Sequence, residues 1–127
     1  MKLEIWLNKR GVTKETILDL LQHIPDEMQD MAIDDFCDAE TIMKPDEWFY
    51  WPNQDRFVLV GQCPNGDGVA IDTKNKPGTI WYVAHELLEI ESNNEIIIEV
   101  ADSPSDYVSK RDDDDFPWDY WDAKEKN

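Results

Sequence analysis

The sequence predicts one domain in which an antiparallel β-sheet is combined with helices. The 127 residues are 41% hydrophobic and include six tryptophans, which is enough for a single core but short for two domains. Turn signals divide residues 56–85 into three consecutive strand-like runs. Runs with the apolar spacing of helices stand on both sides of these strands.

The N-terminal segment, residues 1–12, is predicted to form a short strand. Leu3, Ile5 and Leu7 alternate with other residues, as on one face of a strand. Trp6 falls on the opposite face, so the alternation between apolar and polar residues is incomplete.

A helix is predicted over residues 13–24, where apolar residues recur at helical spacing. Thr13 is a candidate N-cap, and Glu15 lies in the first turn, where the helix dipole favours a carboxylate. Pro25 ends this helix. Because a proline at the first helical position loses no hydrogen bond, it can open a second helical turn over residues 25–31.

The middle of the chain is predicted to be rich in strands. It contains "DAETIM" (38–43), the aromatic cluster "EWFYWPNQD" (47–55) and the β-branched run "RFVLVGQ" (56–62). Asn65-Gly66 and Asp67-Gly68 then supply residues that tolerate positive φ, which predicts a plain or bulged hairpin. A second turn, "KNKPG", leads into "TIWYVAH", which gives a three-stranded antiparallel meander.

The C-terminal part is predicted to contain one more strand and one more helix. "EIIIEVA" (95–101) is the strand candidate. Ser103 as N-cap, Pro104 at the first position and Asp106 in the first turn predict a helix over residues 104–111. We therefore divide the chain into a domain over residues 1–111 and an acidic, aromatic tail over residues 112–127.

The charge balance limits the kinds of partner. The chain has 12 basic and 29 acidic residues and a formal net charge of −17, which repels nucleic-acid phosphates and anionic membranes. The same surface is complementary to a basic protein, although a merely soluble acidic domain would also carry it. Like charge also opposes self-association, so we expect a monomer rather than a homo-oligomer.

Cysteine usage and hydropathy predict a cytoplasmic protein. Cys37 and Cys63 form neither a zinc-knuckle pattern nor a disulfide framework, so reduced thiols are expected. The N-terminus lacks the continuous apolar run of a signal peptide, and no stretch approaches a membrane span of roughly 18 residues.

The stretch "HELLE" (85–89) differs by one residue from the H-E-x-x-H motif of zinc peptidases. Position 89 is a glutamate, the chain's one other histidine is His23, and "GTIWYV" before His85 favours a strand over the required helix. We therefore interpret His85 as a sheet-end histidine hydrogen-bonded to a carboxylate. No other catalytic motif or metal-binding spacing occurs, so we expect no enzyme activity and no cofactor; a zinc or carboxylate-based hydrolase is the less favoured alternative.

The stretch "VLVGQCPNGDGVAIDTKNKPGTIWYVAHE" (58–86) resembles the central hairpins of the SUKH superfamily, which includes bacterial immunity proteins and yeast cell-wall synthesis regulators. "IEVADSPSDYVSK" (98–110) looks like a later element of that family, and "HIPDEM" (23–28) is similar to its N-terminal helix entry. The residues on the family pattern are Gly61, Gly66, Asp67, Gly68, Ile71, Asp72, Gly78, Ile80, Tyr82, His85 and Glu86.

The resemblance implies an α+β fold, a twisted and mainly antiparallel sheet with helices packed on one side. It also implies a protein without catalysis that binds and neutralises a cognate toxin, frequently a basic nuclease. The charge of −17 fits this role, because an acidic surface can cover a cationic nucleic-acid groove. The alternative is a regulatory or scaffold module without a toxin partner, as the yeast relatives suggest.

Two segments combine aromatic anchors with acids, the residue types expected at an interface with a basic protein. Their candidates are Glu47, Trp48, Tyr50, Trp51 and Asp55 in the first segment, and Asp112, Asp113, Asp114, Asp115, Trp118, Tyr120 and Trp121 in the second. The alternatives are core packing for the first segment and a solvated tail for the second. Asp67 and Asp72 are lower candidates, for which turn capping at a solvated sheet edge is the competing interpretation. The turn residues Gly66, Gly68, Pro77 and Gly78 are predicted to be structural.

Overall fold

The computed structural model describes residues 2–24, 36–44, 56–87, 96–113 and 115–126. Its elements, in chain order, are α1 (Lys2–Lys9), α2 (Lys14–Leu21), α3 (Ala39–Ile42), β1 (Phe57–Gln62), β2 (Gly68–Asp72), β3 (Ile80–Val83), the 3-10 helix η1 (His85–Leu87), β4 (Ile97–Ala101), α5 (Pro104–Lys110) and α6 (Tyr120–Lys126). No helix in these ranges is both long and apolar enough to cross a membrane.

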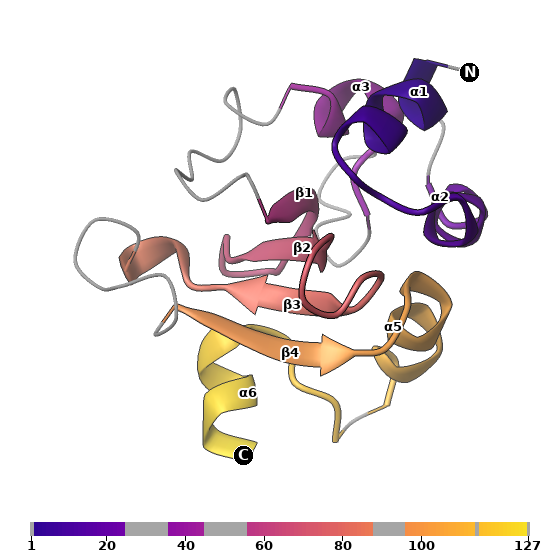
Figure 1. Cartoon of the computed structure of the whole chain (residues 1–127). Helices are drawn as coiled ribbons and strands as arrows, with labels where there is room; N and C mark the ends of the chain where they lie inside the picture. The colour runs from indigo at the N-terminus through magenta and orange to yellow at the C-terminus, as the bar shows by residue number, and fades with distance from the viewer. Residues whose placement is uncertain (1, 25–35, 45–55, 88–95, 114, 127) are drawn as a thin grey trace.

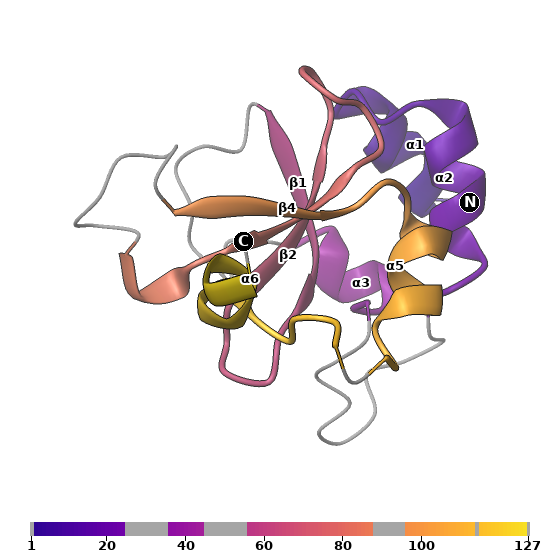
Figure 2. The ribbon, with the colours of Figure 1, turned by 90° about the horizontal axis from the view of Figure 1, so that it is seen from below.

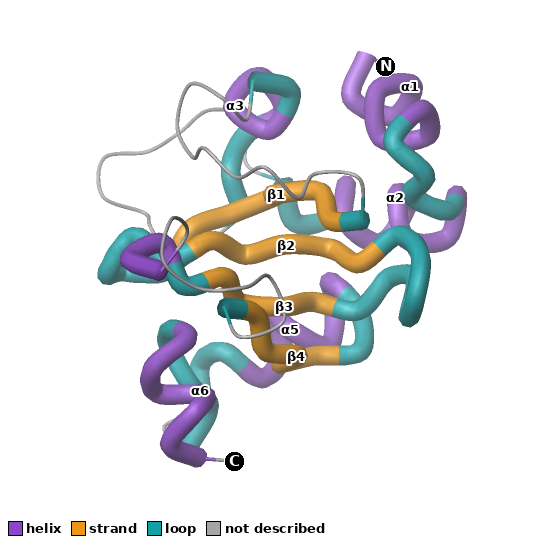
Figure 3. The backbone as a smooth tube through the Cα atoms, turned by 60° about the vertical axis from the view of Figure 1, so that its left-hand side comes forward, coloured by secondary structure: helices purple, strands orange, loops and turns teal. Residues whose placement is uncertain are grey.

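The four strands form one antiparallel sheet in the order β1-β2-β3-β4, so each strand pairs with its neighbour in sequence. Figure 3 shows this order from one edge to the other. The predicted meander and the additional strand are confirmed. The register shifts between Leu59 and Gly61, so the first hairpin is bulged.

Helices pack against this sheet, which confirms the predicted α+β class. In Figure 1 α1 and α3 lie beyond the β1 edge, whereas α6 lies beside β4 at the opposite edge. Seen from below, α6 lies beside β4, and α5 lies beyond the C-terminal end of this strand (Figure 2). The Tyr82 ring on β3 contacts the Tyr107 ring on α5 edge-on, with 6.1 Å between ring centroids. The ring centroid of Phe36 lies 5.6 Å from that of Tyr107.

The helices α2 and α5 begin at the residues that the sequence indicated. The Thr13 Oγ1 accepts a hydrogen bond from the Thr16 N–H at 3.3 Å, and the Ser103 Oγ accepts one from the Asp106 N–H at 3.0 Å. These caps satisfy backbone donors that have no partner within the helix. Both helix predictions are confirmed.

The predicted N-terminal strand is wrong, because residues Lys2–Lys9 form the helix α1. Leu3 and Leu7 are both buried, whereas Ile5 is 58% exposed. Residues four apart share one face of a helix, so the pair at positions 3 and 7 packs inward while position 5 points away. A strand would have placed all three side chains on one face.

The predicted strand over residues 38–43 is also wrong. Asp38 is an N-cap: its Oδ1 accepts the Thr41 N–H at 3.0 Å, and the short helix α3 follows. Ile42, at the end of this helix, is completely buried. The side chain of Asp38 thus competes successfully with strand pairing at this position.

Positive φ angles occur at one glycine in each predicted turn, Gly66 (φ 97°) and Gly78 (φ 93°). Gly68 instead begins β2 and pairs with Gln62 on one side and Val83 on the other. A Cβ at position 78 would lie 2.8 Å from the Thr16 Oγ1, so this turn also packs closely against α2.

The segment predicted as a tail contributes to the core. Tyr120 and Ala123 on α6 are buried, and α6 packs against β4. The domain boundary at residue 111 remains a prediction. The predicted helical turn at residues 25–31 and the aromatic cluster at residues 47–55 lie outside the described residues.

Candidate functional site

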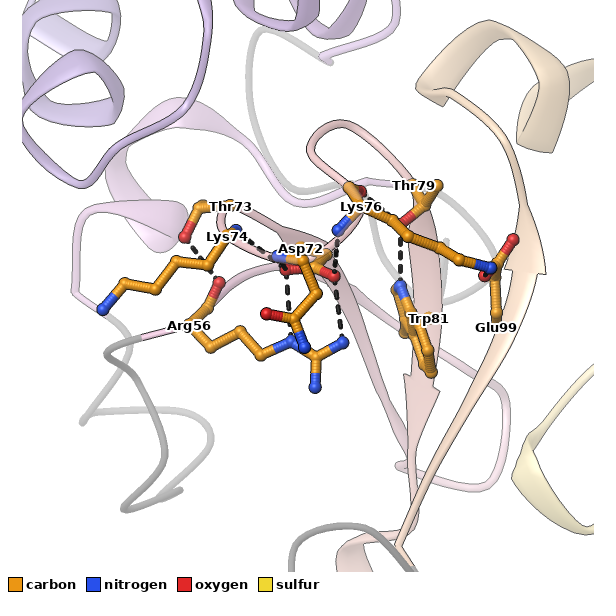
Figure 4. Close-up of polar contacts among 9 residues, drawn as sticks. Arg56, Asp72, Thr73, Lys74, Lys76, Thr79, Trp81 and Glu99 are labelled. Atoms are coloured by element: carbon orange, nitrogen blue, oxygen red, sulfur yellow. Dashed lines mark hydrogen bonds and ion pairs between the residues drawn. The ribbon is translucent and has the colours of Figure 1, made fainter.

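Asp72, the last residue of β2, is completely buried and is surrounded by hydrogen-bond donors. Arg56 Nε donates to Oδ1 at 3.2 Å and Arg56 Nη2 to Oδ2 at 3.0 Å, as Figure 4 shows. The backbone N–H groups of Lys74, Asn75 and Lys76 donate to the same carboxylate at 2.9 to 3.2 Å. Burial acts to raise the pKa of Asp72, but Arg56 and these backbone donors outweigh it and hold the pKa below its ordinary value.

Arg56 is positioned by aromatic rings as well as by Asp72. Its guanidinium carbon lies 4.5 Å from the centroid of Phe57 and 5.2 Å from that of Trp81. The Trp81 Nε1–H donates to the Thr79 Oγ1 at 2.8 Å, which fixes the indole (Figure 4). This end of the sheet is therefore a closed structural cluster, since the groups that could bind a ligand already bind each other.

Asp67, which precedes β2, is also completely buried and connects distant parts of the chain. Its Oδ1 accepts the His85 backbone N–H at 3.0 Å and lies 2.6 Å from His85 Nδ1. Its Oδ2 accepts the Asn65 Nδ2–H and the Tyr120 N–H, both at 3.0 Å. Asp67 therefore joins the β1–β2 turn, the start of η1 and the start of α6.

These contacts bear on Asp67 and Asp72, the lower candidates for partner binding, and on the competing interpretation of turn capping at a solvated sheet edge. Each is 0% exposed and saturated by internal donors, so neither carboxylate is accessible to a partner. The turn-capping part of the competing interpretation is right for Asp72, although its carboxylate is buried rather than solvated. For Asp67 it is incomplete, because two of its partners come from outside the turn.

The interpretation of His85 as a sheet-end histidine bound to a carboxylate is confirmed. It follows strand β3, and its ring nitrogen contacts Asp67. The motif "HELLE" begins with the three-residue 3-10 helix η1, whereas two ligands four apart in a zinc peptidase need an α-helix. Within the described residues no three metal-ligating side chains lie together.

A cavity of about 260 Å³ lies where the C-terminal segment meets the sheet and α5. It is lined by Pro64, Tyr82, Tyr107, Arg111, Asp112, Asp113, Phe116, Pro117 and Trp118. Three of these, Asp112, Asp113 and Trp118, were predicted as binding residues from the sequence. The cavity brings them together with aromatic rings from β3 and α5.

Buried hydrogen bonds and ring contacts hold the walls of this cavity. The Tyr82 hydroxyl donates to the Pro117 carbonyl at 2.7 Å and lies 3.3 Å from the Tyr107 hydroxyl. Burial and the neighbouring Tyr107 raise the pKa of Tyr82, so it remains a neutral donor. Phe116 packs edge-on against Tyr107 with 5.8 Å between centroids. Residues 116–120 are therefore held at both ends, by Tyr82 and, through the Tyr120 N–H, by Asp67.

The remaining candidates of the second segment fall into two groups. Trp118 is 67% exposed, Trp121 is 38% exposed, and Asp112, Asp113 and Asp115 are also exposed. Tyr120 is buried, which corrects the expectation that it contacts a partner. Asp114 and the whole first segment (Glu47, Trp48, Tyr50, Trp51 and Asp55) lie outside the described residues.

Sequence reasoning missed the part of the cavity that comes from outside the C-terminal segment. Tyr82 and Tyr107 are apolar-face residues of a strand and a helix, and Pro64 is in a turn. Nothing in their local sequence separates them from ordinary core and turn residues. The part of the site that could be recognised in the sequence was the C-terminal segment, in which acidic residues and tryptophans are concentrated.

A second polar cluster joins α2 to α5. Asp19 Oδ1 accepts a short hydrogen bond from the Ser105 Oγ, and Asp19 Oδ2 accepts the Ser105 N–H at 2.9 Å. His23 Nε2 lies 3.0 Å from the same Ser105 Oγ. In a catalytic triad the carboxylate orients the histidine, whereas here Asp19 accepts the hydrogen bond of the serine hydroxyl directly. The arrangement therefore connects α2 to α5, and it lacks the serine–histidine–carboxylate order of a triad.

The thiol of Cys37 is poorly suited to nucleophilic chemistry. Burial, and to a smaller extent the charge of Asp38, raise the pKa of the Cys37 thiol to about 12. Because the thiolate is the nucleophile, a thiol that remains protonated at neutral pH is unreactive.

Comparison of the chain with family models, with curated proteins and with solved structures finds no match.

Proposed function

We propose that this protein is a non-catalytic immunity protein of SUKH type, which acts as a cytoplasmic monomer. The protein binds a cognate basic toxin that resembles a nuclease. It neutralises the toxin by covering the cationic surface that would otherwise hold nucleic acid. It needs no metal or cofactor. The exposed residues around the C-terminal cavity form the contact surface.

The observation that carries the proposal is the cavity itself. It places the exposed Trp118 beside the exposed carboxylates of Asp112 and Asp113, on walls fixed by buried tyrosines. Interface energy is concentrated in a few aromatic or arginine anchors, while acids steer a basic partner and set its register. Because the cavity wall is already fixed in the free protein, less conformational entropy is lost on binding.

The distribution of charge supports the same surface. Residues 101–127 contain nine acidic and four basic residues, a net charge of −5. Residues 1–24, which include α1 and α2, contain three acidic and four basic residues, a net charge of +1. A basic partner is therefore attracted to the C-terminal segment more than to α1 and α2, and residues 25–100 carry the remaining net charge of −13.

The engaged polar groups support a role in binding rather than in catalysis. Asp67 and Asp72 each accept several internal hydrogen bonds, and the Ser105 hydroxyl donates its hydrogen bond to Asp19. Nucleophilic catalysis needs a side chain activated by a base or by a lowered pKa. The thiol of Cys37 has the opposite shift.

The test is to capture bound polypeptides from the host lysate at low salt and to express each of them alone. The expected result is one basic polypeptide that is toxic alone and harmless when this protein is co-expressed. Binding should weaken as salt is added, because exposed charges are screened. The double variant Asp112→Lys/Asp113→Lys should lose binding and rescue.

The matched control is Glu4→Lys/Glu15→Lys, which changes the net charge equally on exposed residues of α1 and α2. It should retain rescue. Several non-toxic partners would instead support the alternative, a regulatory or scaffold module. Equal loss of rescue in both double variants would contradict the assignment of the contact surface.

A further inference from the structure

We propose that the C-terminal cavity receives an arginine side chain of the basic partner, with the alkyl stem against aromatic rings and the guanidinium toward Asp112 and Asp113. This inference rests on the proposed function and deepens it, because it names the residue of the partner that anchors the complex. The size, the lining and the charge of the cavity all favour this occupant.

The size suits one side chain better than an organic cofactor. The cavity volume is about 260 Å³. Pockets for small molecules commonly measure roughly 300 to 1,000 Å³, so this cavity lies below that range. A single long side chain projecting from a protein surface is the occupant that fits such a volume.

The lining offers flat aromatic surfaces. Tyr82, Tyr107, Phe116 and Trp118 all contribute to the wall. Tyr82 is buried and its hydroxyl is occupied by the Pro117 carbonyl, so it supports the wall from beneath, while the half-buried Phe116 and the exposed Trp118 offer aromatic surface. Trp118 is anchored through its backbone, because its N–H donates to the Asp122 Oδ2 at 3.2 Å, while its indole stays exposed.

The charge around the cavity selects a cation. Asp112 and Asp113 outnumber Arg111 among the charged residues of the described lining. Asp115, two residues after Asp113, is also exposed, and the charge of Asp119 acts on Tyr82. A phosphate or carboxylate ligand would meet these acids and be repelled, and an apolar side chain would leave them without a partner at the interface.

Arginine fits this combination better than lysine. Its planar guanidinium stacks on aromatic faces and donates two parallel hydrogen bonds to carboxylates, whereas a lysine ammonium is a compact and strongly hydrated charge. A cation over a tryptophan ring adds attraction, and arginine is enriched among residues that dominate interface energies. The same stacking occurs inside this protein, where Arg56 lies over Phe57 and Trp81.

The test titrates the folded protein with three small probes followed by two-dimensional NMR. The probes are N-acetyl-L-arginine methylamide, its lysine analogue and its norleucine analogue, which has no charge. The Trp118 indole N–H is assigned with Trp118→Phe. We expect saturable shifts at Trp118 and Phe116, and a dissociation constant about tenfold smaller for the arginine probe than for norleucine, with lysine between them.

Two double variants sharpen this test. Asp112→Asn/Asp113→Asn keeps the shape of both side chains, including the acceptor that Asp113 Oδ1 offers to the Asp115 N–H, but removes their charge. It should remove the preference for arginine over norleucine. Glu4→Gln/Glu15→Gln changes the net charge equally and should leave the preference intact. Equal binding of arginine and norleucine to the unmodified protein, or equal effects of both variants, would overturn the inference.

The failure of this inference is distinguishable from the failure of the proposed function. If the cavity does not bind the arginine probe but the protein still neutralises a toxin, the proposed arginine site is wrong and the proposed immunity function is supported. If the cavity prefers the arginine probe but no bound polypeptide is toxic, the arginine site is supported and the proposed immunity function is wrong.

Discussion

The two ends of strand β2 are each closed by a buried aspartate, but the two carboxylates hold different parts of the molecule together. Asp72 binds Arg56 and the backbone of residues 74–76, none of them more than 16 residues away in sequence. Asp67 binds His85 and the N–H of Tyr120, which is 53 residues away. The first stabilises a hairpin turn, and the second fixes the C-terminal segment that forms the cavity wall.

This difference shows that identical burial does not imply an identical role. Both residues are 0% exposed, and both have a glycine-containing turn beside them. The donors around Asp72 include a guanidinium, so its negative charge is balanced directly. The donors around Asp67 are a histidine ring, a side-chain amide and backbone N–H groups. Loss of Asp72 should therefore lower the free energy of unfolding more, because it leaves the Arg56 guanidinium without its counter-ion, whereas loss of Asp67 should affect α6 most.

The largest effect is expected for Asp72→Asn. The substitution leaves Arg56 without its counter-ion. It also places the asparagine NH2 group against N–H donors of Arg56 or of residues 74–76. We therefore expect the free energy of unfolding to fall by about 3 to 5 kcal/mol. Urea unfolding measures this loss. The exposed pair between Lys76 and Glu99 in the same region is the control, and Glu99→Gln should cost at most about 1 kcal/mol.

The same variant makes a prediction about pH. The pKa of Asp72 is lowered on folding, so its charge stabilises the fold fully above the ordinary carboxyl pKa of about 3.9. That contribution is lost as the pH falls through the lower folded-state pKa. The difference in unfolding free energy between the natural protein and Asp72→Asn should be constant from neutral pH to about pH 5 and narrow below about pH 4. A difference that stays constant into strong acid would contradict the role of the charge.

A smaller and more local effect is expected for Asp67→Asn. Replacing the carboxylate weakens several charge-assisted hydrogen bonds, at a cost of about 2 to 3 kcal/mol. Because one of them holds the start of α6, hydrogen exchange should accelerate at Tyr120 and Ala123 more than in the strands. Uniform acceleration over the whole sheet would show that Asp67 acts like Asp72, and the distinction between the two ends would be wrong.

The smallest effect is expected for His85→Ala. The ring is 33% exposed, and the backbone N–H of His85 still reaches Asp67 after the substitution. We expect a loss of about 1 kcal/mol in the free energy of unfolding. His85→Asn keeps a short side-chain donor and should recover part of this loss. A loss as large as that of Asp67→Asn, or no recovery with asparagine, would show that the histidine does more than donate to Asp67.

Several elements were predictable because their signals lie within a few residues. The turns around Gly66 and Gly78, the caps Thr13 and Ser103, and the strand-like runs between them all appear in the structure. The segment Lys2–Lys9 was not predictable from alternation, because Leu3 and Leu7 fit both a strand and one face of a helix. Packing against the core selects the helix, in which both leucines are buried.

The candidate site was predictable in part for a similar reason. Asp112, Asp113 and Trp118 stand out because acids and tryptophans are concentrated in one short segment. Their partners Tyr82 and Tyr107 come from a strand and a helix and have the pattern of core residues. The burial of Tyr120 was missed because exposure depends on contacts made by α6 with the rest of the domain.

The sequence alone determined the antiparallel meander, the capped helices, the acidic charge and the residue types available for binding. These properties depend on backbone preferences, periodicity and composition, which act over short distances along the chain. The tertiary structure decided that Asp67 fixes α6, that Tyr82 supports the cavity wall and that Leu3 lies on a helix. Those outcomes depend on contacts between residues far apart in sequence, for which burial and complete hydrogen bonding decide which partners meet.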